Sequence, residues 1–132
     1  MNGLADPRGK ESDDLSWRAD KAMRGGRIAE ARDLYAQAAA IEQAIALDSV
    51  NEPIRVRSVL AVSATALWYK AARWAELQSL AHRWLTEPDR LTPDAGAELR
   101  DLLRRSWNES QIATEDLDDM LPVVLRGTDV EV

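Results

Sequence analysis

The stretch from Gly26 to Ala38 reads GRIAEARDLYAQA and opens the clearest helical pattern in the chain. Apolar residues follow one another here at intervals of three and four, which is the spacing of one helix face. They are Ile28, Ala31, Leu34, Tyr35, Ala38, Ile41 and Ile45. The charged residues between them fall on other faces. The pattern therefore predicts a helix over about residues 28–47 that packs one side against a neighbour.

Two glycines in front of this helix indicate where an earlier helix ends. Gly25 and Gly26 can close a helix because glycine accepts the left-handed conformation of a helix C-terminus. The earlier helix is expected to begin after a cap at Ser12 or Asp13 and to run to about residue 24. Its apolar residues at helical spacing are Leu15, Ala19, Ala22 and Met23. The two predicted helices form a hairpin with a tight turn.

Prolines mark the boundaries of three further helices. Each pattern follows a proline, which fits a first helical turn, or stops before one, which cannot continue a helix. The expected helices run over about residues 53–71, 74–86 and 93–108. The first of the three is nearly apolar between Val59 and Tyr69, so we expect it to be the most buried. The sequence thus predicts an all-α fold of about five helices with short connections.

The opening stretch resembles the second helix of a tetratricopeptide repeat. It has a glycine turn, a small residue at Ala31, an aromatic residue at Tyr35 and an alanine at Ala38. A weaker copy follows, because KAARWAEL at residues 70–77 is similar to RGGRIAEA at residues 24–31. The copies are 46 residues apart, whereas the family repeat is about 34 residues long. The resemblance implies two long tetratricopeptide-like (TPR-like) helical hairpins plus a capping helix, and the alternative is a non-repeat bundle of five helices.

Composition divides the chain into three expected parts. Residues 1–11 are polar, so this N-terminus is expected to be disordered. Residues 12–108 form the expected TPR-like helical domain. Residues 109–132 are an acidic C-terminal tail, for which the sequence predicts a short helix over residues 115–121 and a β-prone end.

The distribution of charge excludes several classes of partner. The tail has seven acids and one base, whereas the remaining residues have sixteen of each, so the net charge of −6 lies in the tail. Neither part has the basic excess that a phosphate backbone requires, so nucleic acid is not an expected partner. The longest uncharged stretch, residues 58–69, is shorter than the roughly 20 residues that cross a membrane. No membrane contact is expected.

Composition also bears on where the protein acts. The chain has no cysteine, and its first residues lack the apolar segment of a signal peptide. Arginine outnumbers lysine fourteen to three and alanine is frequent, which is typical of a GC-rich bacterium. We therefore expect a bacterial, cytoplasmic protein.

The chain offers little for catalysis or for cofactor binding. His82 is its one histidine, and a lone imidazole without cysteine is a weak candidate for a metal or for acid–base chemistry. The acids Glu115, Asp116, Asp118 and Asp119 lack the glycine and the terminal glutamate of a calcium loop. We expect no enzyme activity, no cofactor and no metal.

The resemblance also implies a partner-binding surface on the concave side, where the first helix of each hairpin is exposed. The positions assigned to this surface are Ser16, Asp20, Met23, Val59, Val62, Ala66, Tyr69 and Lys70. They lack the clamp of several Lys, Arg and Asn side chains with which some members of the family hold a terminal carboxylate. The alternative is that Val59, Val62 and Ala66 are core beneath the fifth helix.

The tail supplies a second candidate surface. On its expected short helix, an apolar strip of Leu117, Met120 and Leu121 lies beside Asp118 and Asp119. A partner with an apolar groove and a rim of Arg or Lys would fit both. The alternative is a disordered acidic end.

These features favour a non-enzymatic adaptor or accessory subunit of a bacterial complex, which binds another protein. One alternative is a dedicated chaperone or an antitoxin-like neutraliser of a single partner protein. Another is a self-assembling helical protein in which exposed tryptophans form a homodimer.

Overall fold

The computed structural model describes residues 6–120, with side chains throughout that range except at residues 88 and 113–120. This described part consists of five α-helices and one short 3-10 helix, and it contains no strand. The elements are α1 (Arg8–Arg24), α2 (Ile28–Leu47), α3 (Ile54–Lys70), α4 (Trp74–Leu85), η2 (Pro88–Arg90) and α5 (Pro93–Met120). The predicted all-α fold with about five helices is confirmed.

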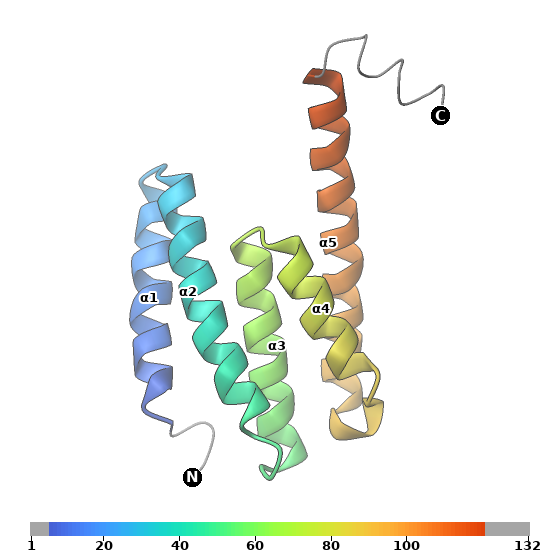
Figure 1. Cartoon of the computed structure of the whole chain (residues 1–132). Coiled ribbons are helices and arrows are strands. Elements are labelled where there is room, and N and C mark those ends of the chain that lie inside the picture. Colours follow the sequence, from blue (N-terminus) through green and yellow to red (C-terminus); the bar gives the residue numbers. More distant parts are fainter. Residues whose placement is uncertain (1–5, 121–132) are drawn as a thin grey trace, which may run out of the picture.

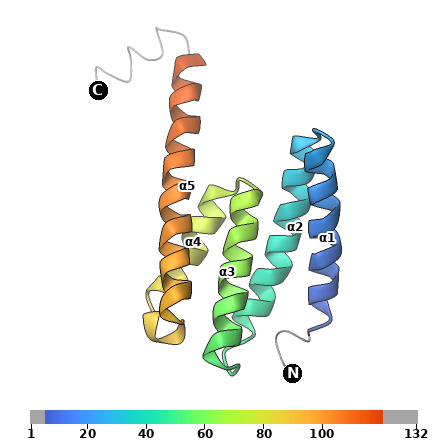
Figure 2. The same cartoon turned by 180° about the vertical axis from the view of Figure 1, so that it is seen from behind.

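The helices follow one another across the molecule in chain order (Figure 1). α1 and α2 form one hairpin, α3 and α4 form a second, and α2 packs against α3. α5 packs against both α3 and α4, and α4 lies behind α3 and α5 when the molecule is seen from the other side (Figure 2). The C-terminal part of α5 extends beyond the ends of the other helices in both views.

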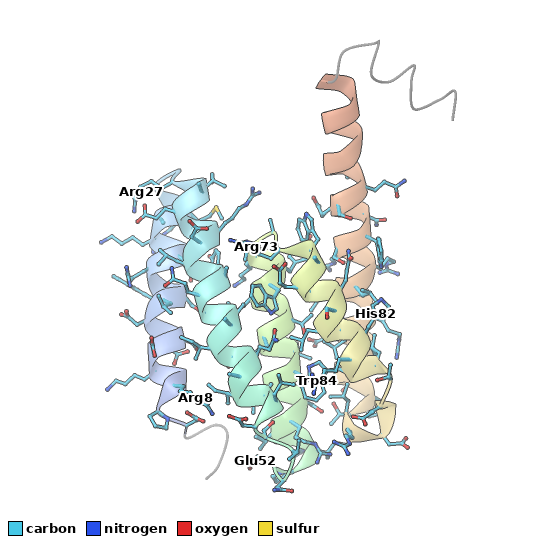
Figure 3. All side chains as sticks on the ribbon, in the orientation of Figure 1. Arg8, Arg27, Glu52, Arg73, His82 and Trp84 are labelled. Atoms are coloured by element: carbon cyan, nitrogen blue, oxygen red, sulfur yellow. The ribbon has the colours of Figure 1, made fainter. Side chains whose placement is uncertain are left out.

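The two hairpins have the same turn, 46 residues apart. The residue with a positive φ angle is Gly26 at 77° in the first turn and Ala72 at 56° in the second. The next residue then donates its N–H to a carbonyl five positions earlier, Arg27 to Ala22 at 2.9 Å and Arg73 to Trp68 at 3.1 Å. This is the left-handed helix ending that the glycines predicted. Arg27 and Arg73 mark the two turns at the same end of the molecule (Figure 3).

The interiors of the two hairpins differ in the size of their side chains. In the first hairpin the most buried positions are alanines, Ala19, Ala22, Ala31 and Ala38, each at most 1% exposed. The residues 46 positions later are larger but also buried, Thr65, Trp68, Leu77 and Trp84. Small residues let two helices approach closely, whereas bulky residues hold them apart.

The first helix begins earlier than the sequence predicted. α1 starts at Arg8, so residues 8–11, which we expected to be disordered, are helical. Asp6 accepts a hydrogen bond from the backbone N–H of Arg8 at 2.9 Å, which satisfies one of the free donors at the helix start. The guanidinium of Arg8 also lies 3.0 Å from the carboxylate of Asp48. The helix start is therefore held against the end of α2.

The fifth helix ends later than the sequence predicted. α5 is one helix from Pro93 to Met120, so the boundary expected at residue 108 and the separate short helix expected from residue 115 are both wrong. No glycine or proline occurs between residues 97 and 121, and nothing in this range interrupts the helix. The predicted boundary followed a change in charge, which does not stop a helix. The β-prone end of the tail lies outside the described residues.

Candidate functional site

One face of α3 is open. Val59, Val62 and Ala66 follow each other at helical spacing, and the Val59 side chain is 56% exposed. The opposite face is buried against the other helices, with Leu60, Ala61 and Ala64 at most 4% exposed. α3 has a larger share of buried residues than α1, α2 or α4, which agrees with the prediction that it is the most buried helix, but Val59 lies on an exposed face. Val59 is therefore not core beneath the fifth helix, whereas Val62 is partly buried and packs against the core.

A groove runs along this open face between α3 and α5. One hollow of about 640 Å³ and a second of about 420 Å³ share Val62 and Glu98 and follow one another along the two helices. We call the two together the α3–α5 groove. It is lined by Arg55, Ser58, Val59, Val62, Ser63 and Ala66 from α3, by Thr92, and by Asp94, Ala95, Ala97, Glu98, Asp101, Leu102 and Arg105 from α5.

Hydrogen bonds at the start of α5 fix the width of the groove. The backbone N–H of Thr92 donates to the Ser58 hydroxyl of α3 at 2.9 Å. The Thr92 hydroxyl in turn accepts a hydrogen bond from the N–H of Ala95 at 3.3 Å, as a helix cap does. Leu91 and Ala95 are buried beside these contacts. The lower end of α5 is therefore anchored directly on α3.

The α5 side of the groove carries carboxylates. Asp94 and Glu98 are exposed and form no ion pair within the part of the chain that the structure describes. Asp101, one turn further on, accepts from Arg104 and lies 3.0 Å from Arg105. The floor beside these acids is formed by the valines of α3. The groove thus combines an apolar floor with an acidic edge.

A third hollow lies on the other side of Val59. It has a volume of about 530 Å³ and is formed by the start of α1 together with α2 and α3. Asp13 and Glu42 line it, and Glu42 accepts a hydrogen bond from the Ser12 hydroxyl at 2.7 Å. Val59 and Ser63 belong to both this hollow and the α3–α5 groove. Val59 is therefore an exposed apolar residue with carboxylates on both sides.

Two other predicted site residues meet at a tyrosine instead of lining the groove. The hydroxyl of Tyr35 in α2 donates to the Asp20 carboxylate in α1, and the Lys70 ammonium of α3 lies 5.6 Å from the Tyr35 ring centroid. Burial, together with the hydrogen bond to Asp20, raises the pKa of Tyr35 to about 12. Tyr35 therefore stays protonated at neutral pH and links the first hairpin to the second.

The remaining predicted residues of the helical body are partly buried. Met23 packs against the core, and so does Tyr69, whose ring lies edge-on to Trp74 at 5.5 Å between centroids. The sequence predicted Tyr35 only as a packing residue. A buried tyrosine needs a partner for its hydroxyl, and this was the signal for the contact with Asp20.

The structure places most of the predicted tail residues on α5. Leu117, Asp118, Asp119 and Met120 belong to the last turns of this helix, and their side chains lie outside the described set. Leu121 lies outside the described residues altogether. Earlier on the same helix, Trp107 is 54% exposed and Ile112 is 52% exposed.

The described residues give no sign of a metal centre. His82 is exposed near the end of α4. No three histidine or acidic side chains in the described set are grouped so that they could hold a metal ion. None of the described helices has both the length and the apolar content needed to cross a membrane.

Comparison of the chain with protein-family models, curated proteins and solved structures finds no match. The function is therefore argued from the α3–α5 groove and the residues around it.

Proposed function

We propose that this chain is a non-enzymatic adaptor or accessory subunit of a bacterial, cytoplasmic complex, and that the α3–α5 groove holds a segment of another protein. The observation that carries the proposal is the exposed apolar floor of the groove. Val59 is 56% exposed and lines two adjoining hollows, one of which belongs to the groove. Exposed apolar surface rimmed by polar groups is a mark of protein interaction sites.

The shape of the groove suits a polypeptide. The stretch of α3 that lines it, from Arg55 to Ala66, is about 17 Å long at about 1.5 Å per residue. This length matches about three turns of a bound helix. Both walls are helices, and Thr92 fixes the distance between them through Ser58, so the site exists before a partner arrives.

The proposal includes a TPR-like origin for the two hairpins. The identical hydrogen bonding of the two turns, 46 residues apart, supports an internal repeat. In such a stack the first helix of each hairpin lines one surface, and α3 is the first helix of the second hairpin. α5 then closes the stack as a capping helix.

A photo-crosslinker tests this proposal directly. Val59 is replaced by p-benzoylphenylalanine in one variant and Gln37, an exposed residue of α2 that lines none of the hollows, in another. Irradiation in the native host is expected to attach a second protein through position 59 and not through position 37. Mass spectrometry then identifies the attached protein.

Two results would contradict the proposal. Equal labelling through both positions would show that other proteins contact the groove no more often than they contact the exposed surface of α2. Attachment of a second copy of this chain through position 59 would favour a homodimer instead of an adaptor.

A further inference from the structure

We propose that the segment bound in the α3–α5 groove is an amphipathic helix that carries Lys or Arg beside a narrow apolar stripe. This inference rests on the proposed function, because it names the occupant of the same groove. The spacing, the size and the charge of the groove residues support it.

The first argument is the spacing along the groove. Val59, Val62 and Ala66 stand at positions i, i+3 and i+7 of α3. Asp94, Glu98 and Asp101 stand at i, i+4 and i+7 of α5. Both rows repeat once per helical turn, about 5.4 Å. A bound helix repeats its side chains at that distance, whereas an extended strand repeats each face at about 7 Å.

The second argument is the size of the lining residues. Ala66 and Ala97 both line the second hollow, and Ser63 lines the first together with Val59 and Val62. Helix axes approach to about 8–10 Å where such small side chains meet. A third helix can therefore lie between α3 and α5, with its own larger apolar side chains on the valines.

The third argument is charge complementarity. The α3–α5 groove is lined by three acids, Asp94, Glu98 and Asp101, and by two bases, Arg55 and Arg105, and Asp101 already pairs with Arg105. Asp94 and Glu98 have no ionic partner among the described side chains. An occupant with Lys or Arg along its flank would supply that partner.

The same charge argues against an occupant from this chain. Residues 109–132 have seven acids and one base, so they would be repelled by the acidic edge of the groove, whether they came from the same molecule or from a second copy. With three acids and two bases, the groove also lacks the basic excess that nucleic acid requires.

Synthetic peptides test the inference. The basic probe is a helical peptide with leucines at i, i+4 and i+7 and lysines on both flanks of that stripe. The acidic probe has glutamate in place of every lysine. Fluorescence anisotropy at low ionic strength is expected to show binding of the basic probe alone, because screening is then weakest.

Two matched variants locate the binding. The first is Asp94→Asn with Glu98→Gln, and it is expected to weaken the basic probe by roughly 5–30-fold. The second is Glu11→Gln with Glu76→Gln, which removes the same charge from exposed residues that do not line the groove and is expected to change affinity by less than about 2-fold. Val59→Lys is expected to abolish binding, and circular dichroism checks that it remains helical.

The outcomes separate this inference from the proposed function. If both probes bind equally and Val59→Lys abolishes both, the groove binds helices but the charge argument is overturned. If the Asp94/Glu98 variant and the Glu11/Glu76 variant lose the same affinity for the basic probe, the attraction is not located in the groove and the inference fails. If neither probe binds, the inference fails while crosslinking through position 59 still decides the proposed function.

Discussion

The two hairpins begin their second helices in the same way and then pack differently. Both turns place a residue at positive φ and close with the same backbone hydrogen bond. α1 and α2 then run side by side along their lengths, whereas α4 tilts away from α3 towards α5 (Figure 1). The turn fixes where the second helix of a hairpin begins. The size of the side chains between the two helices then fixes how closely the helices pack along their lengths.

The tilt of α4 has a direct consequence for the groove. Trp68 and Trp84 occupy positions where the first hairpin has Ala22 and Ala38. α4 contacts α5 as well as α3, and α5 also contacts α3. The hairpin that contains these two tryptophans is therefore also the one that packs against α5, next to the groove.

The largest effect on stability is expected when a small residue of the first hairpin is replaced by the larger residue found at the equivalent position of the second. Ala31→Leu introduces the side chain that the second hairpin has at Leu77. Ala31 is 0% exposed, so overpacking is expected to cost about 1–3 kcal/mol of unfolding free energy. Chemical denaturation followed by circular dichroism measures this cost. Ala40→Leu, on the exposed side of the same helix, is the control, and equal stability of the two variants would contradict the close packing of α1 and α2.

A smaller difference in stability is expected between substitutions of the two tryptophans of the second hairpin. The indole N–H of Trp68 donates to the Gln43 side chain at 2.8 Å. The indole N–H of Trp84 is buried and, among the described residues, has no hydrogen-bond partner. Trp68→Phe is therefore expected to cost about 1 kcal/mol more than Trp84→Phe, because it leaves Gln43 without its donor. Urea denaturation of both variants tests the difference, and a larger loss for Trp84→Phe would contradict it.

The smallest effects are expected at the turns themselves. Gly26→Ala places a side chain at positive φ, where it meets no atom within 4 Å, so its cost of about 1 kcal/mol comes from the backbone alone. Ala72→Gly relieves the same strain in the second turn and is expected to stabilise by about 0.5 kcal/mol, because added freedom of the unfolded chain offsets part of the gain. Thermal unfolding measures both. If Gly26→Ala destabilises the protein and Ala72→Gly stabilises it, the two turns are equivalent. A change of stability in the same direction for both variants would contradict this.

Most helix positions could be predicted from the sequence because short-range signals set them. Gly25-Gly26, Pro53 and Pro93 lie where helices end or begin in the structure. The start of α1 could not be predicted, because it depends on Arg8 reaching both Asp6 and Asp48, and Asp48 is distant in sequence. The end of α5 was misplaced because a change of charge was treated as a boundary.

The candidate site could be predicted only in part. Val59 and Val62 were assigned from their positions on the first helix of a hairpin, and both line the groove. Asp94 and Glu98 were missed, because the fifth helix was treated as a cap and not as a wall. Their one-turn spacing was visible in the sequence, but which helix they would face depends on the contact of Thr92 with Ser58.

The order of the helices also bears on how the protein is made. Most of the main helix contacts join elements that follow each other in the chain, which is typical of rapidly folding helical proteins. The first hairpin can therefore form while later residues are still being synthesised. The contact between α3 and α5 skips a helix and is made only after α5 has emerged from the ribosome. The groove is consequently the last part of the described body to be completed, so a nascent chain has no finished groove before α5 is synthesised.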